Sequence, residues 1–180
     1  LLDSADLSRL GSGPHIVHGG TLGMFRGTTA ETLAHLAETH EGIVSLDCNV
    51  RPQIIDDQAR WHHFHDRWLA HTNIYKGSNE DFEWIWPGRS MESCADELIK
   101  NGTDVVVLTR GSDGLSIVTA DGEARAPAPF VAVVDTVGAG DTIVAALLSS
   151  LWNHGDGSGT SMLADISISD IELVTRKIVG

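Results

Sequence analysis

Five consecutive residues, Val105-Val-Val-Leu-Thr109, constrain the fold of this chain more than any other segment. The run is too apolar to present one face to water, so it predicts a strand buried on both faces, as central parallel strands are. Elsewhere in the chain, short β-type runs alternate with segments of helical period, which is the pattern of βαβ units. The sequence therefore predicts an α/β fold with a mainly parallel sheet.

The other predicted elements follow from hydrophobic period, helix caps and turn signals. Thr28 and Glu31 have the spacing of a capping box at the start of a helix. The turn signal Ala120-Asp-Gly122 predicts an antiparallel hairpin attached to the sheet. Strands are expected at 15–18, 43–46, 73–75, 105–109, 115–118, 123–126 and 131–134, helices at 28–40, 56–70, 79–86, 90–101 and 139–152, a flexible break at 155–159, and a second capping box at 169–172.

Length and composition indicate one domain over residues 1–180. Of the 180 residues, 42% are hydrophobic and 21% are charged, which is enough to bury a core. Twelve basic and 25 acidic side chains give a formal net charge of −13, which argues against nucleic acid or an anionic membrane as a partner. No apolar run reaches the roughly 18 to 20 residues of a membrane span. Cys48 and Cys94 lack the spacing of a zinc site or a disulfide framework, so a reducing cytoplasm is expected.

A glycine-rich turn joins a predicted strand to a predicted helix at Asp135-Thr-Val-Gly-Ala-Gly-Asp141. Gly138 and Gly140 leave backbone N–H groups of the first helical turn uncovered, where the helix dipole also favours an anion. A carboxylate at Asp141 would repel a phosphate unless it takes a proton from the hydroxyl that attacks that phosphate. The plainer alternative is that Asp141 only interacts with the helix dipole.

Four segments in order resemble the PfkB, or ribokinase-like, carbohydrate kinases. Asp135-Thr-Val-Gly-Ala-Gly-Asp141-Thr resembles the signature of this family, and Thr109-Arg-Gly-Ser-Asp-Gly114 is similar to its nucleotide loop. Asp47-Cys-Asn-Val-Arg51-Pro and Lys76-Gly-Ser-Asn-Glu-Asp81 resemble two further family segments, the first of them typical of the fructokinase branch. The resemblance implies a three-layer α/β/α fold of the ribokinase type, with the small β lid of the family absent from this chain.

For the reaction, the resemblance implies that Asp141 deprotonates a sugar hydroxyl. Gly138, Ala139 and Gly140 would form an anion hole that stabilises charge on the transferred phosphoryl group. This agrees with the physics of phosphoryl transfer, which depends mostly on positioning and charge stabilisation.

The resemblance places the nucleotide beside the loop after the central strand. Thr109 and Gly111 would approach the phosphates of ATP, Gly114 would shape the loop, and Arg110 would add positive charge. Ser78 stands where many relatives have Asn, and is the fifth candidate contact. The alternative for this segment is an ordinary turn after a strand, with Arg110 solvated.

Other residues are candidates for binding ions and the acceptor substrate. The resemblance implies that Asp135 and the Val137 carbonyl bind an activating monovalent cation such as K⁺, although Asp135 could equally be a helix cap partner. Asp81 would act through water on the Mg²⁺ that ATP carries. Asn49 and Arg51 are the candidates for contact with sugar or phosphate, since the Arg fork suits phosphate or carboxylate.

These residues predict ATP-dependent phosphorylation of a sugar hydroxyl, most like a fructokinase. A 2-keto-3-deoxygluconate kinase and a ribokinase-type sugar kinase are alternatives of the same class, and a non-catalytic remnant that only binds nucleotide is the alternative of another class. The sugar-holding N-terminal portion of the family and its lid, which often builds a homodimer, find no match here. We therefore expect a truncated kinase with little activity as the isolated chain.

The other patterns in the sequence do not predict a further functional site. The run Trp61-His-His-Phe-His65 puts two histidines on one helical face, but without a third ligand it predicts a solvated histidine-rich face rather than a metal site. Gly19-Gly20 predicts a turn. The dinucleotide fingerprint and the P-loop pattern are both absent from the sequence.

Overall fold

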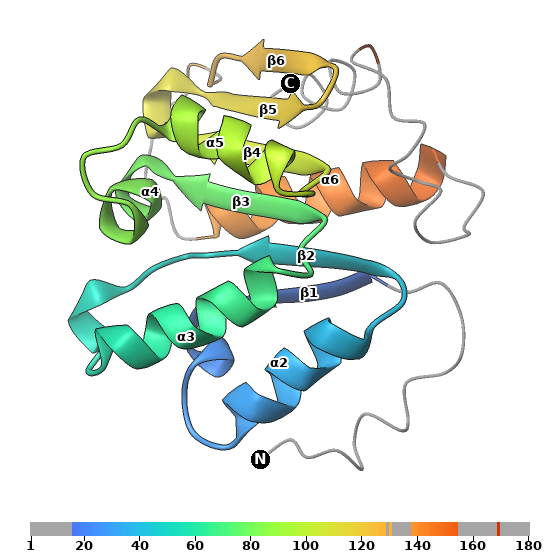
Figure 1. Ribbon diagram of the computed structural model, residues 1–180. Helices are drawn as coiled ribbons and strands as arrows, with labels where there is room; N and C mark the ends of the chain where they lie inside the picture. The colour runs from blue at the N-terminus through green and yellow to red at the C-terminus, as the bar shows by residue number, and fades with distance from the viewer. Residues whose placement is uncertain (1–15, 129, 131–137, 155–168, 170–180) are drawn as a thin grey trace.

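The computed structural model describes residues 16–128, 130, 138–154 and 169, and in these ranges all strands belong to one six-stranded sheet (Figure 1). The first four strands are parallel, and the last two continue the sheet as an antiparallel hairpin. The strands are β1 Ile16–Gly20, β2 Ile43–Asp47, β3 Ile74–Ser78, β4 Val105–Thr109, β5 Leu115–Thr119 and β6 Gly122–Ala126.

The strands follow one another across the sheet in sequence order, which fixes where the helices lie. Crossovers between parallel strands are right-handed, so successive crossovers in one direction put their helices on the same face. The helices of this face are α2 Thr29–Thr39, α3 Gln58–Leu69, α4 Asn79–Ile85 and α5 Met91–Lys100. Helix α6, Ala139–His154, comes after the hairpin and covers the opposite face (Figure 1). The predicted three-layer α/β/α arrangement is therefore confirmed.

Each face of the sheet has its own hydrophobic core. On the face of α2 to α5, the fully buried rings of Trp68, Tyr75 and Phe82 dominate. On the other face, Leu147 and Leu151 of α6 pack on alternate strand residues, namely Ile43, Ile74, Val105, Val107, Leu115 and Ile117. Strand β4 contributes to both cores and is buried along Val105–Leu108, as its composition predicts. Among the described residues, no helix is both long and apolar enough to cross a bilayer.

Most predicted elements form within one or two residues of their expected ends, and the exceptions have tertiary causes. The strand predicted at 73–75 extends to Ser78, because Lys76 is paired inside the protein. The predicted capping box at Thr28 is wrong: Thr28 has helical φ and ψ and no side-chain cap bond. Its expected partner, Glu31, instead accepts a hydrogen bond at 2.6 Å from Arg67 of α3.

Two further interpretations of the sequence are corrected. His65 is not part of a solvated face, because it is 2% exposed and stacks on Trp61 with ring centroids 4.8 Å apart. Gly19 lies inside β1 rather than in a turn, and a Cβ there would meet the Trp68 ring at 2.4 Å. The strand expected at 131–134 and the break at 155–159 lie outside the described residues, and of the capping box at 169–172 only Ser169 is described.

Candidate active site

The carboxyl ends of the parallel strands bring the predicted site segments to one edge of the sheet. In the register, Asp47 lies beside Lys76, and Ser78 lies beside Thr109. The Asp47–Arg51 segment follows β2, the Ser78–Asp81 segment follows β3, and the loop Arg110–Gly114 follows β4. Ligands of open α/β sheets bind at this edge, so the topology supports a site here.

Helix α6 begins at the same edge, on the opposite face of the sheet from α2 to α5. Gly138 has a positive φ of 81° and nothing within 4 Å of the position of an added Cβ, so the turn before the helix is open on one side. Its carbonyl accepts hydrogen bonds from the Thr142 N–H at 2.9 Å and the Thr142 hydroxyl at 2.8 Å. Ala139 and Asp141 are exposed in the first turn, and Gly140 is half-buried.

Beneath this first turn lies a buried ion pair that the sequence did not predict. Lys76 Nζ lies 3.0 and 2.8 Å from the two carboxylate oxygens of Asp47, with side-chain exposures of 8% and 4%. A Cβ added to Gly140 would lie 2.7 Å from this ammonium group and 4.0 Å from Asp47 Oδ2. A side chain at position 140 would therefore have to displace the Lys76 ammonium from its pair with Asp47, whatever the role of Gly140 toward phosphate.

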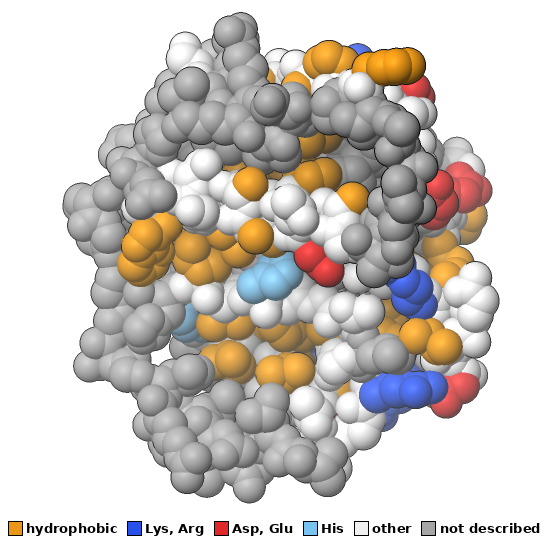
Figure 2. All heavy atoms as spheres, turned by 180° about the vertical axis from the view of Figure 1, so that it is seen from behind, with side chains coloured by type: hydrophobic (Ala, Val, Ile, Leu, Met, Phe, Trp, Pro, Cys, Tyr) orange, Lys and Arg blue, Asp and Glu red, His pale blue; other side chains and the backbone are white. Residues whose placement is uncertain are grey.

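Burial raises the pKa of Asp47, even though the Lys76 ammonium acts in the opposite direction. Two poorly solvated charges of opposite sign, the Lys76 ammonium and the Asp47 carboxylate, therefore lie under the helix turn that carries Asp141. Viewed from the side of α6, the described surface here is mostly apolar or uncharged, with an acidic side chain and a histidine near its middle (Figure 2).

The segment after β2 is held in place by Asp81. Its Oδ1 accepts the Val50 N–H at 2.7 Å, and its Oδ2 accepts the Ser78 N–H at 2.8 Å. Ser78 in turn accepts the Asp81 N–H, so the two residues form a complete capping box at the start of α4. Asp81 is 4% exposed. Its observed role is to join the start of α4 to the loop after β2.

Asn49 and Arg51 flank the residue that Asp81 holds. Asn49 has a positive φ of 37°, a conformation that Asn tolerates better than most residues. Arg51 is exposed, and its guanidinium donates to the carbonyl of Val50 at 3.0 Å. The structure thus places both predicted substrate contacts at the carboxyl edge, on a loop with a fixed anchor.

The loop after β4 is a tight turn closed by a hydrogen bond of 2.8 Å from the Arg110 N–H to the Gly114 carbonyl. Gly114 has a φ of 91°, and a Cβ there would lie 2.1 Å from the Ala126 carbonyl oxygen, so no larger residue fits. Gly111 is exposed with open space beside it, and Thr109 is half-buried at the strand end. The Arg110 guanidinium is engaged by Glu92 and Ser116, which direct it toward α5 and β5.

Comparison with known proteins identifies the family of this chain. Residues 2–164 match the pfkB family of carbohydrate kinases. The chain belongs to this family. A fructokinase of Rhizobium leguminosarum bv. trifolii is 35% identical over 153 residues, which are 84% of this chain and 47% of the relative. An aminoimidazole riboside kinase of Salmonella typhimurium is 32% identical over 118 residues, 63% of this chain and 37% of the relative.

Solved kinases share the fold of this pfkB-family chain. The crystal structure of aminoimidazole riboside kinase from Salmonella enterica, complexed with aminoimidazole riboside and an ATP analog, matches with a TM-score of 0.74 and 25% identity, covering 93% of this chain and 56% of that one. Fructokinase with bound ATP from Xylella fastidiosa matches with a TM-score of 0.80 and 20% identity, covering 91% and 52%. The chain therefore spans about half the length of the relatives it matches.

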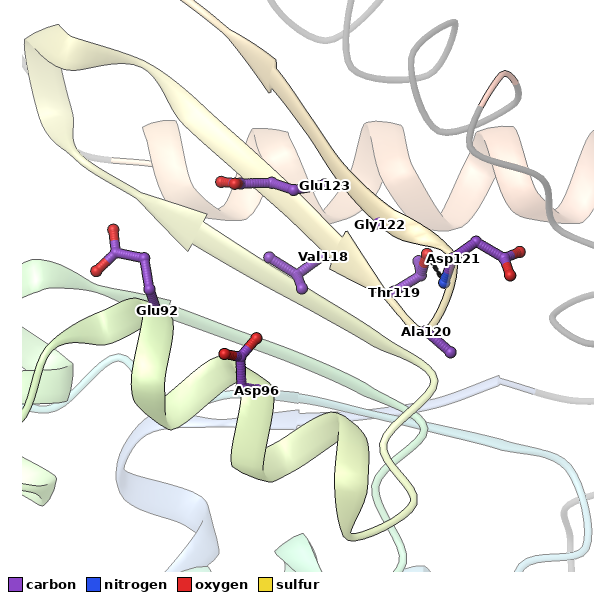
Figure 3. A pocket seen from close by; sticks show the side chains of 8 residues that line it. All are labelled: Glu92, Asp96, Val118, Thr119, Ala120, Asp121, Gly122 and Glu123. Carbon is purple, nitrogen blue, oxygen red and sulfur yellow. Dashed lines mark hydrogen bonds between the residues drawn. The ribbon is translucent and has the colours of Figure 1, made fainter.

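The described part of the pfkB-family chain has no group of three or more His, Cys, Asp or Glu side chains that could hold a metal ion. Asp135 and Val137, the predicted monovalent-cation ligands, lie outside the described residues. A pocket of about 330 Å³ between α5 and the β5–β6 hairpin is lined by four carboxylates (Figure 3). Two of them have arginine partners, Glu92 with Arg110 and Glu123 with Arg125. Its acidic lining does not suit a phosphate.

The structure adds a buried polar chain on the α3 side of the same strands. The Cys48 thiol donates to the Tyr75 hydroxyl at 2.7 Å, and this hydroxyl lies 3.1 Å from His65 Nε2. His65 Nδ1 lies 3.1 Å from a carboxylate oxygen of Asp66, which is exposed. Burial lowers the pKa of His65, so the neutral ring can donate from Nδ1 to Asp66 and accept the Tyr75 proton at Nε2.

Sequence reasoning missed Lys76, the Asp47 carboxylate and this polar chain as parts of the site region. One signal was available for the ion pair: Asp47 and Lys76 each follow a short β-type run and are the first residues of a predicted site segment. An ionisable residue inside a buried strand requires a partner, and the neighbouring strand is where that partner must be found.

Proposed function

We propose that the full-length protein transfers the γ-phosphoryl group of ATP to a sugar hydroxyl, as a fructokinase-like enzyme. The observation that carries the proposal is the start of α6, where Asp141 follows Gly138-Ala-Gly140 at the carboxyl edge of the sheet. Membership of the pfkB family and the 35% identity to a fructokinase support the same reaction.

In this proposal, the backbone N–H groups of Gly138, Ala139 and Gly140 face the transferred phosphoryl group, and the helix dipole adds favourable potential. Asp141 takes the proton from the attacking hydroxyl. The Lys76 ammonium lies closer to Gly140 than the Asp47 carboxylate does, so the positive end of this pair faces the turn, and Asp47 keeps it in a fixed position.

The remaining contacts keep the roles that the family resemblance implies. Thr109 and Gly111 approach the nucleotide phosphates, with Gly114 shaping their loop, and Ser78 lies beside Thr109 in the register. Arg110 is the weakest of these candidates, because Glu92 and Ser116 already occupy its guanidinium.

Asn49 and Arg51 are the proposed contacts to the acceptor sugar or the transferred phosphate. Their loop is anchored by Asp81 through the Val50 N–H, so its position is defined before any substrate arrives. A pre-formed loop avoids part of the ordering cost of binding.

Ions enter through two predicted sites. ATP would bring Mg²⁺, which supplies charge neutralisation on the phosphates. Each Asp81 oxygen accepts one backbone N–H and keeps a further lone pair, so contact with Mg²⁺ through a water fits, whereas direct ligation would compete with the α4 cap. A monovalent cation such as K⁺ at Asp135 and the Val137 carbonyl remains a prediction.

The acceptor is expected to be fructose, with 2-keto-3-deoxygluconate, ribose and aminoimidazole riboside as the competing acceptors. A coupled ADP-release assay on the full-length gene product separates them through kcat/KM. Turnover of ketodeoxygluconate but not fructose would replace the proposed specificity, and nucleotide binding without any turnover would favour the non-catalytic alternative.

Asp141→Asn tests the chemistry. The carboxamide keeps the shape of the side chain but cannot take the hydroxyl proton, so kcat should fall by about 10²–10⁴ with little change in ATP affinity. Asp121→Asn, in the exposed hairpin turn, is the matched control and should retain full activity. An Asp141→Asn enzyme as active as the wild type would refute the role of Asp141 as base.

A further inference from the structure

His18 of β1 points toward the same face of the sheet as α6. Alternate residues of a strand share a face, and Ile16, Ile43 and Ile74 all pack in the core that contains Leu147 and Leu151 of α6. His18 lies two residues after Ile16, and its register partner Ser45 lies two residues after Ile43. His18 and Ser45 therefore lie on the α6 face. Ser45 precedes Asp47 by two residues in β2, so these two side chains share that face.

One nitrogen of the His18 ring is anchored and the other is available. Nδ1 lies 3.1 Å from the hydroxyl oxygen of Ser45, which is itself 2% exposed. In the described ranges, Nε2 has no hydrogen-bond partner, and the His18 side chain remains exposed although α6 covers this face. A ring held at Nδ1 by a buried hydroxyl presents Nε2 in a defined direction.

Three charged groups act on His18 from three different elements. Asp47 of β2 and Asp141 of α6 favour the protonated ring, and Lys76 of β3 opposes it. The largest influence is the loss of water from the part of the ring that neighbouring residues cover, and the pKa of His18 is lowered overall. The ring is therefore neutral at pH 7, and with Nδ1 accepting the Ser45 hydroxyl proton, Nε2 carries the hydrogen.

We propose that His18 is a substrate-contacting residue whose Nε2–H donates a hydrogen bond to an oxygen of the acceptor sugar held beside Asp141. The inference rests on the proposed kinase function and adds a residue of the outer strand β1 to the acceptor site. A neutral donor suits this position, because a lysine here would pair with Asp141 and take away its availability as a base.

Two substitutions of His18 test the roles of its two ring nitrogens separately. His18→Asn keeps a polar group near the Nδ1 position, facing Ser45, and removes the group at Nε2. His18→Gln places an amide near the Nε2 position. In the full-length protein, His18→Asn should raise the KM for the acceptor about tenfold, the effect of one lost hydrogen bond, with kcat and the KM for ATP nearly unchanged. His18→Gln should restore most of the affinity.

Histidine NMR supplies a readout that does not depend on turnover. In protein labelled at the histidine Cε1 positions, the pKa of His18 should fall further in Asp141→Asn, because one of the charges that raises it is gone. Saturating acceptor sugar should shift the His18 resonance but not that of exposed His63. These two results locate His18 beside Asp141 and beside the acceptor.

The outcomes are distinguishable. An unchanged acceptor KM in His18→Asn, or an equal rise in His18→Asn and His18→Gln, overturns the inference while leaving the kinase function intact. If either variant fails to fold, the NMR measurements on the wild type and Asp141→Asn decide, and a His18 resonance insensitive to both sugar and Asp141→Asn overturns the inference. Absence of any turnover by the wild-type full-length protein would instead refute the proposed kinase function.

Discussion

Strands β2 and β3 bury polar side chains on both of their faces, but they do so with different chemistry. On the α6 face, Asp47 and Lys76 form a charged pair beneath Gly140. On the α3 face, Cys48, directly after β2, and Tyr75 of β3 join a chain of buried neutral groups that includes His65. The charges thus lie where a phosphate site is proposed, and the neutral groups lie where helices close over the core.

This difference predicts how the free energy of unfolding should change when one member of each cluster is removed. A buried charge that loses its partner keeps its full desolvation cost, whereas a neutral group that loses a hydrogen bond loses much less. Both clusters position the loop after β2, because Asp47 and Cys48 are the residues immediately before Asn49. Substitution of single members of each cluster therefore tests this difference.

Lys76→Met should have the largest effect. Methionine resembles the length of lysine but leaves the Asp47 carboxylate buried without its partner, which should cost about 3–5 kcal/mol of unfolding free energy in urea denaturation. The loss should be smaller at acid pH, where Asp47 escapes the penalty by taking up a proton. The double variant Asp47→Leu/Lys76→Met removes both charges and should recover most of the stability. A double variant as unstable as Lys76→Met would contradict this account.

Tyr75→Phe should have an intermediate effect. Removing the hydroxyl leaves the Cys48 thiol and His65 Nε2 unpaired in the core, which should lower the unfolding free energy by about 1–3 kcal/mol. A double-mutant cycle with Cys48→Ala provides the control. Because the two groups contact each other, their effects should not add, and strict additivity would show that the hydrogen bond between them contributes nothing.

His65 should make its own contribution to the pH dependence of stability. Burial lowers the pKa of His65 in the folded protein below its ordinary value of 6.5, so the unfolded chain binds a proton more readily. The contribution is fully present above pH 6.5 and is lost as the pH falls below it. His65→Gln should reduce this slope in urea denaturation between pH 5 and 7, while the exposed His63→Gln should leave it unchanged. Equal slopes in wild type and His65→Gln would refute the prediction.

Much of the fold could be predicted because its signals are local. The run Val105–Thr109 forms the strand that its composition demands, and the turn at Ala120-Asp-Gly122 joins the two strands of the hairpin. Ser90 caps α5 through the Ser93 N–H, within the element predicted there. The four family segments also supplied the candidate site residues, and their meeting at one edge of the sheet is seen in the structure.

The errors occurred where a distant residue overrode a local preference. Glu31 bonds to Arg67 rather than completing a cap at Thr28, and His65 is drawn into the core by Tyr75. In each case the competing partner lies on another element, at a distance along the chain that periodicity and cap rules cannot evaluate.

The sequence by itself determined the class of fold, the order of its elements and the segment that carries Asp141, because strand composition, turns and caps act over a few residues. Only the tertiary structure decided that Lys76 meets Asp47, that Cys48 meets Tyr75, and that His18 shares a face with α6. The physical reason is register: successive residues of a strand point to opposite faces, so which polar groups meet depends on how each strand aligns with its neighbours.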